Sequence, residues 1–567
     1  MSGRPNLPAA ISLMEDCLGT DIKTMITRKT WVIISAIILP ATVAFGQGLS
    51  TPSDVQLELL DTVPAESVPD NPTGFNNPLF ENGKLLAFPG AKGYSRFTTH
   101  ARGCKVVLMN TLEDDRIAGN GKLSFYEAMT MTGCRYVIPT VGGVVHLEDV
   151  EVKLSNAQVQ NLYFAGQAAP SPGLVVTSRV VNIGDNAKDV LLRHVTFRGA
   201  GTTNATRAEN NRALSVSGGN VENILIDHIS ASWATDETTM TFLGPSETAG
   251  LRKVSWTNSI MAEGDAASMH PESVEKSKDG LHATGASCMN NNYDHAMEEV
   301  SFIGNLIVDQ NQRLPVINGC HAEIFDNYIA NWRFSAIKVR TQTAEASVHI
   351  ANNLFAPGDQ SPVKTPFYNY YNDNSSNSPI GLQGCNEDCT IRLWFQRFVL
   401  GANIGDNYFW PRDESWSSVY KLAPHPHEEA LSRDTRFSPS YTPETPASSL
   451  WAHTSKTWDT VGHTVPVRDA VDSRIISETK SRTNILGIDD YNRMDGNTAI
   501  TPDSKRDFSS YSSTQWPASY DKDLDGMADA WELSVGLNPN DGSDHSGDRN
   551  GDGLTNIEEF LSGLAGD

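Results

Sequence analysis

Two acidic segments near the end of the chain have the residue spacing of calcium-binding loops. The segments "DKDLDGMADAWE" (521–532) and "DRNGDGLTNIEE" (548–559) each place oxygen-bearing side chains around a glycine that permits a sharp turn. The predicted ligands are Asp521, Asp523, Asp525, Asp529 and Glu532 in the first loop and Asp548, Asn550, Asp552, Asn556 and Glu559 in the second. The alternative is an acidic disordered tail. We predict an EF-hand-like calcium module with a structural role.

An arginine in an unusual setting is the second candidate for chemistry. Arg313 lies in "DQNQRLPVING" (309–319), after an apolar run and among amides. It could cap a strand, pair with a carboxylate or contact an anionic substrate. The segment alone does not decide between these roles.

Composition limits the partners of the chain. A chain of 567 residues is too long to fold around one small core. Its net charge is -24, and its pI is near 5.0. Such a charge argues against binding nucleic acid or an anionic membrane by long-range attraction. An acidic partner would need local cations or a metal.

The start of the chain predicts export. Residues 25–47 combine Arg28 and Lys29 with an apolar run that is short for a spanning helix, and Ala44-Phe45-Gly46 fits a signal-peptidase site before Gln47. We expect a secreted, monomeric protein. The six cysteines beyond the signal then favour disulfides. Nearness in sequence alone suggests the pairs Cys104–Cys134, Cys288–Cys320 and Cys385–Cys389.

A short strand pattern recurs between residues 190 and 410. Each copy is an apolar strand interrupted by His or Asn, and the interrupting residues are His194, His228, Asn258, Asn305, Asn327, Asn353 and Asn407. The shortest separations, 22 and 26 residues, define one coil, and longer ones add loops. Asparagine tolerates left-handed backbone geometry and can bond to the next rung, so we expect an Asn ladder at a corner.

The pattern predicts an all-β fold, a right-handed, single-stranded parallel β-helix. A β-sandwich would show regular short hairpins, which are scarce. The predicted boundaries are an extension and signal (1–46), a linker (47–84), the β-helix (85–480), a second linker (481–520) and the calcium tail (521–567). Within the β-helix unit, 465–480 is expected to form a capping helix through Val471, Ile475 and Ile476.

Four segments carry a family resemblance. "AFPGAKGYSRFTT" (87–99), "FAGQAAP" (164–170), "ILIDHISASWATDE" (224–237) and "VDQNQRLP" (308–315) resemble, in order and spacing, the bacterial pectate lyases of polysaccharide lyase family 1, including members with a calcium-loop tail. The resemblance implies cleavage of polygalacturonate by β-elimination, with calcium bridging enzyme and substrate carboxylates.

The resemblance also implies roles for individual residues. Arg313 matches the base that removes the C5 proton, although a free guanidinium is a poor base because its pKa exceeds about 12. Lys278 matches a lysine that holds a substrate carboxylate, and Arg340 could assist. Asp236 and Glu237 are the candidate calcium-bridging carboxylates. The pair Asp227 and His228 is expected to have a structural role at a coil turn.

Two positions depart from the family pattern. Arg212 stands where related chains usually carry Asp before "ALSVSGG", which could shift calcium toward Glu209 or Asn210. Asn318 stands near an expected cation. A non-catalytic polysaccharide-binding β-helix or adhesin therefore stays open, whereas a polygalacturonase lacks its carboxylate motifs here. Appearance of a C4–C5 double bond in the product would separate these readings.

Overall fold

The computed structural model describes residues 78–567 except for 118, 148–149, 200–204, 266–267, 269, 275–281, 341–345, 357–366, 370–379, 384–390, 401–407, 411–437, 442–456, 482–507 and 509–510. The chain divides into two compact units, 1–50 and 51–567, and every described residue belongs to the second. The predicted signal, Lys278, Asn407 and the Cys385–Cys389 pair lie outside the described residues. Among the residues described, no helix is both long and apolar enough to cross a membrane.

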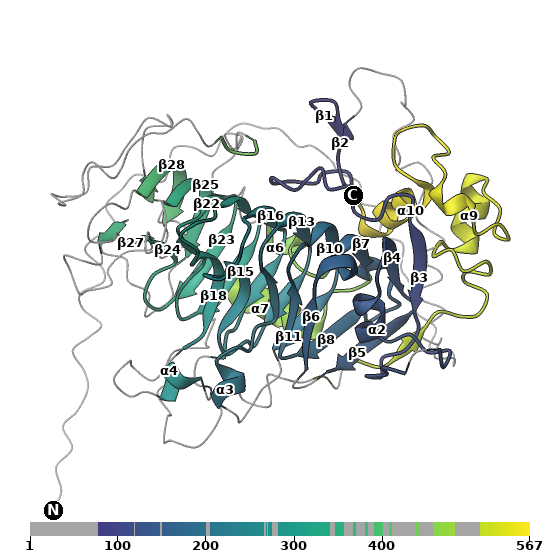
Figure 1. The fold of residues 1–567 in the computed structure, drawn as a ribbon, viewed down its shortest axis with the longest axis horizontal. Helices are drawn as coiled ribbons and strands as arrows, with labels where there is room; N and C mark the ends of the chain where they lie inside the picture. Colours follow the sequence, from purple (N-terminus) through teal and green to yellow (C-terminus); the bar gives the residue numbers. More distant parts are fainter. Residues whose placement is uncertain are drawn as a thin grey trace, which may run out of the picture. The chain divides into compact units, whose positions relative to one another are not determined.

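Most strands stack in parallel in three rows, one strand of each row per coil (Figure 1). Row A contains β3 (Lys105–Met109), β4 (Arg135–Pro139), β7 (Gln160–Ala165), β10 (Lys188–Arg193), β13 (Val221–Asp227), β16 (Leu251–Thr257), β19 (Met297–Ile303), β22 (His321–Phe325), β25 (Ala346–Ala356) and β28 (Ile391–Leu400). Row B contains β5 (Val141–His146), β8 (Leu174–Ser178), β11 (Thr196–Gly199), β14 (Ser230–Ser232), β17 (Ile260–Ala262), β20 (Leu306–Gln310), β23 (Tyr328–Trp332) and the second half of β25. Row C contains β6 (Glu151–Leu154), β9 (Val180–Ile183), β12 (Leu214–Ser217), β15 (Glu237–Leu243), β18 (Thr284–Asn290), β21 (Val316–Asn318), β24 (Ile337–Arg340), β27 (Ile380–Gln383) and β26 (Phe367–Asn369). The predicted parallel β-helix is confirmed.

Short elements decorate the coils. The hairpin β1 (Phe80–Glu81) and β2 (Lys84–Leu85) is antiparallel, as are the pairings of β29 (Tyr408–Trp410) with β28 and of β30 (Thr514–Gln515) with β5. The helices are α2 (Phe125–Thr130), α3 (Ala205–Ala208), α4 (Pro271–Val274), α6 (Thr457–Thr460), α7 (Ala470–Ser481), α9 (Asp529–Val535) and α10 (Asn556–Ala565), with 3-10 turns η2 (Asn156–Gln158), η3 (Gly166–Ala168) and η6 (Asp544–Ser546).

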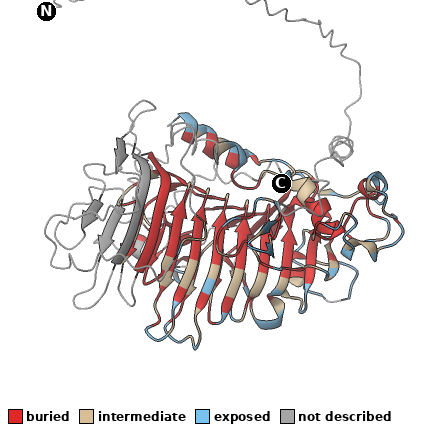
Figure 2. Cartoon of the chain, turned by 90° about the horizontal axis from the view of Figure 1, so that it is seen from above, coloured by how far each residue is buried: buried red, intermediate tan, exposed pale blue. Residues whose placement is uncertain are grey.

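Alternation along the strands separates an inner core from outer contacts. In β13, Ile224 and Ile226 join the apolar interior of the coils, whereas Leu225 between them packs outward. This follows from the two-residue period of a strand, and the β-branched residues suit a pleated, buried surface. Figure 2 shows the result, with buried residues along the stacked strands and exposed residues in the turns.

The Asn ladder is present at the corner between rows A and B. Amide bonding between rungs and left-handed backbone geometry, however, belong to two neighbouring residues and not to one. Asn305 Nδ2 donates to Asn327 Oδ1 at 3.0 Å, and Asn327 Nδ2 donates to Asn353 Oδ1 at 2.9 Å. The left-handed residue is the one before: His194, His228, Asn258, Gly304, Asp326 and Asn352. The prediction that His194, His228 and Asn258 align with Asn305 is therefore wrong by one position, and Ser259 occupies the rung beside Asn305.

The helix predicted near 465–480 forms as α7, but it does not cap the end of the coils. Val471, Ile475 and Ile476 are buried against outward side chains of row B, including Ile260 and Val308. Row B presents apolar residues on both faces, so its outer face needs a cover. The helix supplies that cover.

The acidic tail packs against the first coils. Its Trp531, Ile557 and Phe560 share an apolar cluster with Tyr136 and Leu225 of the β-helix. Polar contacts reinforce the docking: Arg102 Nε lies 2.9 Å from Glu558 Oε1, Arg193 makes two bonds of 2.7 and 2.8 Å to Asp567, and Trp516 Nε1 donates to the Ala168 carbonyl at 3.0 Å. The predicted linker 481–520 thus includes β30 and Trp516, which already touch the coils.

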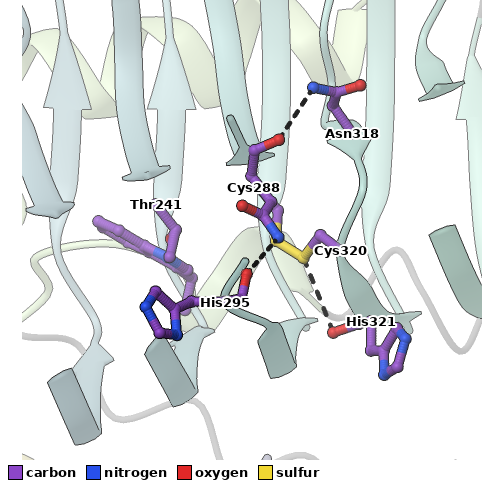
Figure 3. Close-up of a disulfide and its surroundings, with 8 residues drawn as sticks. Thr241, Cys288, His295, Asn318, Cys320 and His321 are labelled. Atoms are coloured by element: carbon purple, nitrogen blue, oxygen red, sulfur yellow. Dashed lines mark hydrogen bonds between the residues drawn. A yellow bond between two sulfur atoms is a disulfide. The ribbon is translucent and has the colours of Figure 1, made fainter. Parts of the chain in front are cut away.

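Two predicted disulfides are confirmed. Cys104 is bonded to Cys134, with a Cα separation of 5.5 Å. Cys288 of β18 is bonded to Cys320, which follows β21, with a Cα separation of 6.3 Å (Figure 3). The second bridge links adjacent coils close to the strand that Arg313 precedes.

Candidate functional site

The connections from row B to row C, some long and some short, end at the same edge of row C and bring charged residues together there. Arg212 precedes β12, Asp236 precedes β15, His282 precedes β18 and Arg313 precedes β21. The register places Glu237 beside Thr284, which in turn bridges to Gln312. Residues distant in sequence therefore occupy successive rungs of one parallel ladder.

Two arginines hold the buried carboxylate of Glu237. Arg212 Nε lies 3.1 Å from Glu237 Oε2, Arg313 Nη1 contacts Glu237 Oε1, and Arg212 Nη2 also contacts Asp236 Oδ2. Glu237 is 2% exposed, whereas both arginine side chains are 17% exposed. Burial would raise the pKa of Glu237, but Arg313 and Arg212 outweigh it and lower that pKa below the usual range. The arginines are the part of the cluster that reaches solvent.

Two histidines complete the surroundings of Asp236. His282 Nε2 lies 3.2 Å and His270 Nε2 lies 3.9 Å from the same oxygen, Asp236 Oδ1. The two rings are stacked, with centroids 3.9 Å apart and an interplanar angle of 11°. Ser273 in α4 holds the backbone just before β18 in place, because its Oγ accepts the His282 backbone N–H at 2.9 Å. Burial and the neighbouring Glu237 raise the pKa of Asp236 to about 6.

Row C continues with further cations beyond Arg313. In β24, Lys338 and Arg340 are two residues apart and both half-buried, so they share the outward face of the strand. Val316 of β21 is in register with Lys338, and Asn318 is in register with Arg340. Burial, followed by the charges of Arg340 and Arg313, lowers the pKa of Lys338 to about 7.

The predicted site residues separate into three groups. Asp236, Glu237 and Arg313 lie together, with Arg340 on a following coil. Lys278 is outside the described residues. Asn318 is fully buried, and its Nδ2 contacts the Asn290 carbonyl at 3.5 Å (Figure 3), so it does not stand in for a surface cation.

Asp227 and His228 lie at a different corner, between rows A and B. His228 Nδ1 is 2.6 Å from Asp227 Oδ2, and Arg193 Nε is 2.9 Å from the same oxygen. Arg193 continues to Asp567 at the end of the chain. The structural role predicted for this pair agrees with that position, since it links a coil turn to the docked tail.

Sequence reasoning missed three residues of the cluster. His270 and His282 flank "PESVEKSKDGL", and the sequence does not show that their rings lie beside Asp236. Lys338 lies two residues before the predicted Arg340, and strand periodicity could have placed it on the same face. Arg212 was noted as a departure, but its pairing with both acids could not be inferred from sequence.

The donors around Asp236 do not fit calcium. Calcium prefers carboxylate, carbonyl and water oxygens, whereas Asp236 is faced by two imidazoles and a guanidinium. Glu237, the other predicted ligand, is engaged by two arginines. The guanidinium of Arg212 supplies positive charge in this cluster.

In the tail, the oxygens of several carboxylates lie close to one another. Ligand atoms of Asp521, Asp523 and Asp525 lie close enough to share one ion, as do those of Asp525, Glu532 and Asp544. Asp548, Asp552 and Glu559 form the corresponding group in the second loop. Asp544 is an addition that the loop pattern did not predict.

Three predicted tail ligands make other contacts. Asp529 accepts the Lys522 backbone N–H at 2.9 Å, and Asn556 Nδ2 donates to the Asp544 carbonyl at 2.7 Å. Asn550 Nδ2 donates to Asp552 Oδ2 at 3.1 Å. These residues are absent from the groups of close ligand atoms formed by the described part of the chain.

Buried oxygens in the tail fit calcium. Within the part of the chain that the structure describes, both carboxylate oxygens of Asp523 and Glu532 and one of Asp525 are buried without a hydrogen-bond partner. Burying ionised oxygens without hydrogen-bond partners costs free energy. A hard divalent cation would coordinate these oxygens and offset that cost. When bound, calcium would link the first loop to the segment before the second loop through Asp525, Glu532 and Asp544.

Comparisons with known proteins indicate a relationship to fungal sequences. No protein-family profile matches the chain. It is 28% identical over 281 residues to a probable pectate lyase C of Aspergillus flavus, a match covering 49% of this chain and 56% of that protein. The chain spans about half the length of this relative and of that from Emericella nidulans, at 48%. A probable pectate lyase C of Aspergillus fumigatus is 25% identical over 492 residues, 85% of this chain and 94% of that protein. The motifs suggested bacterial relatives, but these proteins are fungal.

Solved structures give weaker similarities. Pectate lyase Bsp165PelA from Bacillus sp. N165, solved with trigalacturonate, has a TM-score of 0.34 and 14% identity, covering 66% of this chain and 98% of its own. The cedar pollen allergen jun a 1 has the same TM-score and identity, covering 52% of this chain and 84% of its own. The fold assignment depends on the strand rows described above.

Proposed function

We propose that the chain is a secreted polysaccharide lyase that cleaves α-1,4-polygalacturonate by β-elimination and releases C4–C5 unsaturated oligogalacturonates. One observation carries the proposal: row C gathers four cations, Arg212 and Arg313 before their strands and Lys338 and Arg340 on the outward face of β24, on a chain whose net charge is -24. Local cations are what an acidic protein needs to bind an acidic polymer. The sequence similarity to pectate lyases supports the same assignment.

The proposed reaction uses Arg313 as the base. In its neutral form, the guanidine takes the C5 proton, the C5–H electrons form the C4–C5 double bond, and the C4–O bond breaks. The departing sugar oxygen then takes a proton from water. The charge that develops on the uronate carboxylate is stabilised by neighbouring cations. Arg212 already contacts Glu237, so it can hold the Glu237 carboxylate when Arg313 turns to the substrate.

Calcium, in this proposal, serves the tail. Asp521, Asp523, Asp525, Glu532 and Asp544 would hold one or two ions, and the second loop another. Such metal-dependent folding suits an exported protein with disulfides. Lys278 remains a proposed substrate ligand, and a monomer remains the proposed state.

A second candidate is a non-catalytic polysaccharide-binding β-helix. The ion pair of Arg313 with buried Glu237 favours it, because a guanidinium that is engaged by a carboxylate of the protein is not turned toward a substrate proton. This candidate predicts binding of polygalacturonate without a change in its covalent structure.

The test is the ultraviolet absorbance of unsaturated products released from polygalacturonate. We expect product from the wild-type chain and a loss of at least about 100-fold in Arg313→Ala. Arg252→Ala is the matched control, since Arg252 is exposed and pairs with Glu222 away from the cluster. Binding of polymer by the wild type without product would overturn the lyase assignment in favour of the binding protein.

A further inference from the structure

We infer that Asp236, His270 and His282 form a site for a divalent transition metal such as zinc. Their three ligand atoms all lie within 4.8 Å of one another, and all three residues are buried. The site differs from the oxygen-rich calcium loops in both its donors and its position in the fold. It combines two imidazoles with one carboxylate, a set that catalytic zinc sites use.

The geometry supports one ion between the three side chains. Nitrogens of two loops converge on Asp236 Oδ1, at 3.2 Å from His282 and 3.9 Å from His270. Tetrahedral zinc with bonds of about 2.0–2.2 Å separates its ligand atoms by roughly 3.3 Å. The two rings are stacked face to face, so one of them must turn out of the stack before both nitrogens can point at one ion. The three ligand atoms lie close enough together for one ion to join them after that turn.

The supporting framework fixes the ligands from three directions. Asp236 and His282 lie at the start of adjacent strands, β15 and β18, which are in register. His270 precedes α4, whose Ser273 holds the His282 backbone. Arg212 occupies the second oxygen of Asp236 and leaves Oδ1 facing the histidines. Metal sites depend on such outer contacts to orient their ligands.

The charge balance predicts what the metal would bind. Asp236 and Glu237 are offset by Arg212 and Arg313, so a divalent ion adds two positive charges that the described cluster does not neutralise. Three protein ligands leave at least one coordination position open. This step rests on the proposed function: the open position would take a uronate carboxylate, the role that the family resemblance gives to calcium.

The experiment measures metal binding in the full chain while the tail is saturated with calcium. Co²⁺ is the probe, because four- or five-coordinate Co²⁺ with nitrogen ligands absorbs visible light much more strongly than Co²⁺ in an all-oxygen octahedral site. We expect one Co²⁺ per chain with such a spectrum, displaced by Zn²⁺. His282→Ala and His270→Ala should each weaken binding by at least about 100-fold.

His295→Ala is the control, because this partly exposed histidine belongs to a turn outside the cluster. Circular dichroism and the unfolding temperature establish that each variant folds. If a variant fails to fold, the wild-type spectrum and its competition with Zn²⁺ decide the question. The inference is overturned if calcium-saturated wild type binds no Co²⁺, or if His282→Ala and His295→Ala bind it equally. Nitrogen-ligated Co²⁺ without any lyase product would uphold the metal site and refute the proposed function.

Discussion

Two groups of buried carboxylates in this molecule meet opposite surroundings. At the edge of row C, Glu237 is neutralised by Arg212 and Arg313. In the tail, Asp523 and Glu532 have buried oxygens without hydrogen-bond partners among the described residues. Asp523 and Glu532 therefore fit a cation better than Glu237 does, because no arginine already neutralises the charge at their unpaired oxygens in the described structure.

The pKa values of the buried carboxylates also differ between the two regions. Burial raises the pKa of Glu532 to about 8 and that of Asp525 to about 7, and neighbouring carboxylates contribute in the same direction. For Glu237 the arginines reverse the effect of burial and lower the pKa. Without metal, Glu532 and Asp525 of the tail therefore lower the stability of the folded chain at neutral pH, whereas Glu237 does not.

The largest expected effect tests whether the tail belongs to the β-helix fold. Phe560→Ala removes a buried ring whose centroid lies 5.3 Å from the ring centroid of Trp531. We expect a loss of about 3–5 kcal/mol in the free energy of unfolding, measured with denaturant. Leu533→Ala, at a side chain in the same tail with 66% exposure, should change it by less than about 0.5 kcal/mol. Equal, small effects would mean that the tail contributes no stability.

The next prediction breaks the row C cluster. Glu237→Gln leaves Arg212 and Arg313 without their shared charge partner. If Glu237 positions both guanidinium groups, product formation should fall about 100-fold, or ~2.7 kcal/mol. Glu222→Gln, which changes a carboxylate paired with Arg252 and Lys253 elsewhere, is the control. Full activity in Glu237→Gln would contradict a positioning role.

Calcium removal should act through the tail. Calcium at about 30 times its Kd would stabilise the chain by ~2 kcal/mol, and a chelator should remove that increment. Because the folded pKa values of Glu532 and Asp525 are raised, the metal-free chain should lose stability as pH rises from about 4 to 8. Unfolding temperatures across this range with and without calcium test both points.

A variant separates the tail carboxylates from other calcium effects. Glu532→Gln should reduce the stabilisation by calcium and also flatten the metal-free pH profile. Asp541→Asn, at an exposed acid outside the groups of close ligand atoms, should change neither. An unaltered calcium response in Glu532→Gln would remove this residue from the ligand set.

The smallest effect concerns Lys338, a half-buried cation on the outward face of β24. Its pKa falls to about 7 in the folded chain, from 10.5. Below pH 7 both states carry the proton and the burial penalty is complete, whereas between pH 7 and 10.5 the unfolded state binds more protons and stability rises. Lys338→Met should therefore stabilise the chain by ~1 kcal/mol at pH 6 and by less at pH 10. Lys153→Met, at a side chain with 69% exposure, should show no such trend in urea unfolding.

Much of the fold was accessible from local pattern. The recurring strands, the two described disulfides and helix α7 follow from apolar periodicity and cysteine spacing. The ladder position was misassigned for Asn258 because Asn serves both left-handed turns and inward amide stacking, and sequence does not separate the two. The position of α7 on row B was also hidden, since an apolar helix face does not identify its partner.

The sequence by itself determined the coil and the calcium-loop spacing, because each is encoded within a short run of residues, whereas Arg313 was singled out through the family resemblance. Only the tertiary structure decided that Arg212 and Arg313 share Glu237, that His270 and His282 face Asp236, and that the tail docks on the first coils. These contacts join residues that are far apart in the chain. Stacking of the coils and folding of their long loops set those distances, and no local pattern records them.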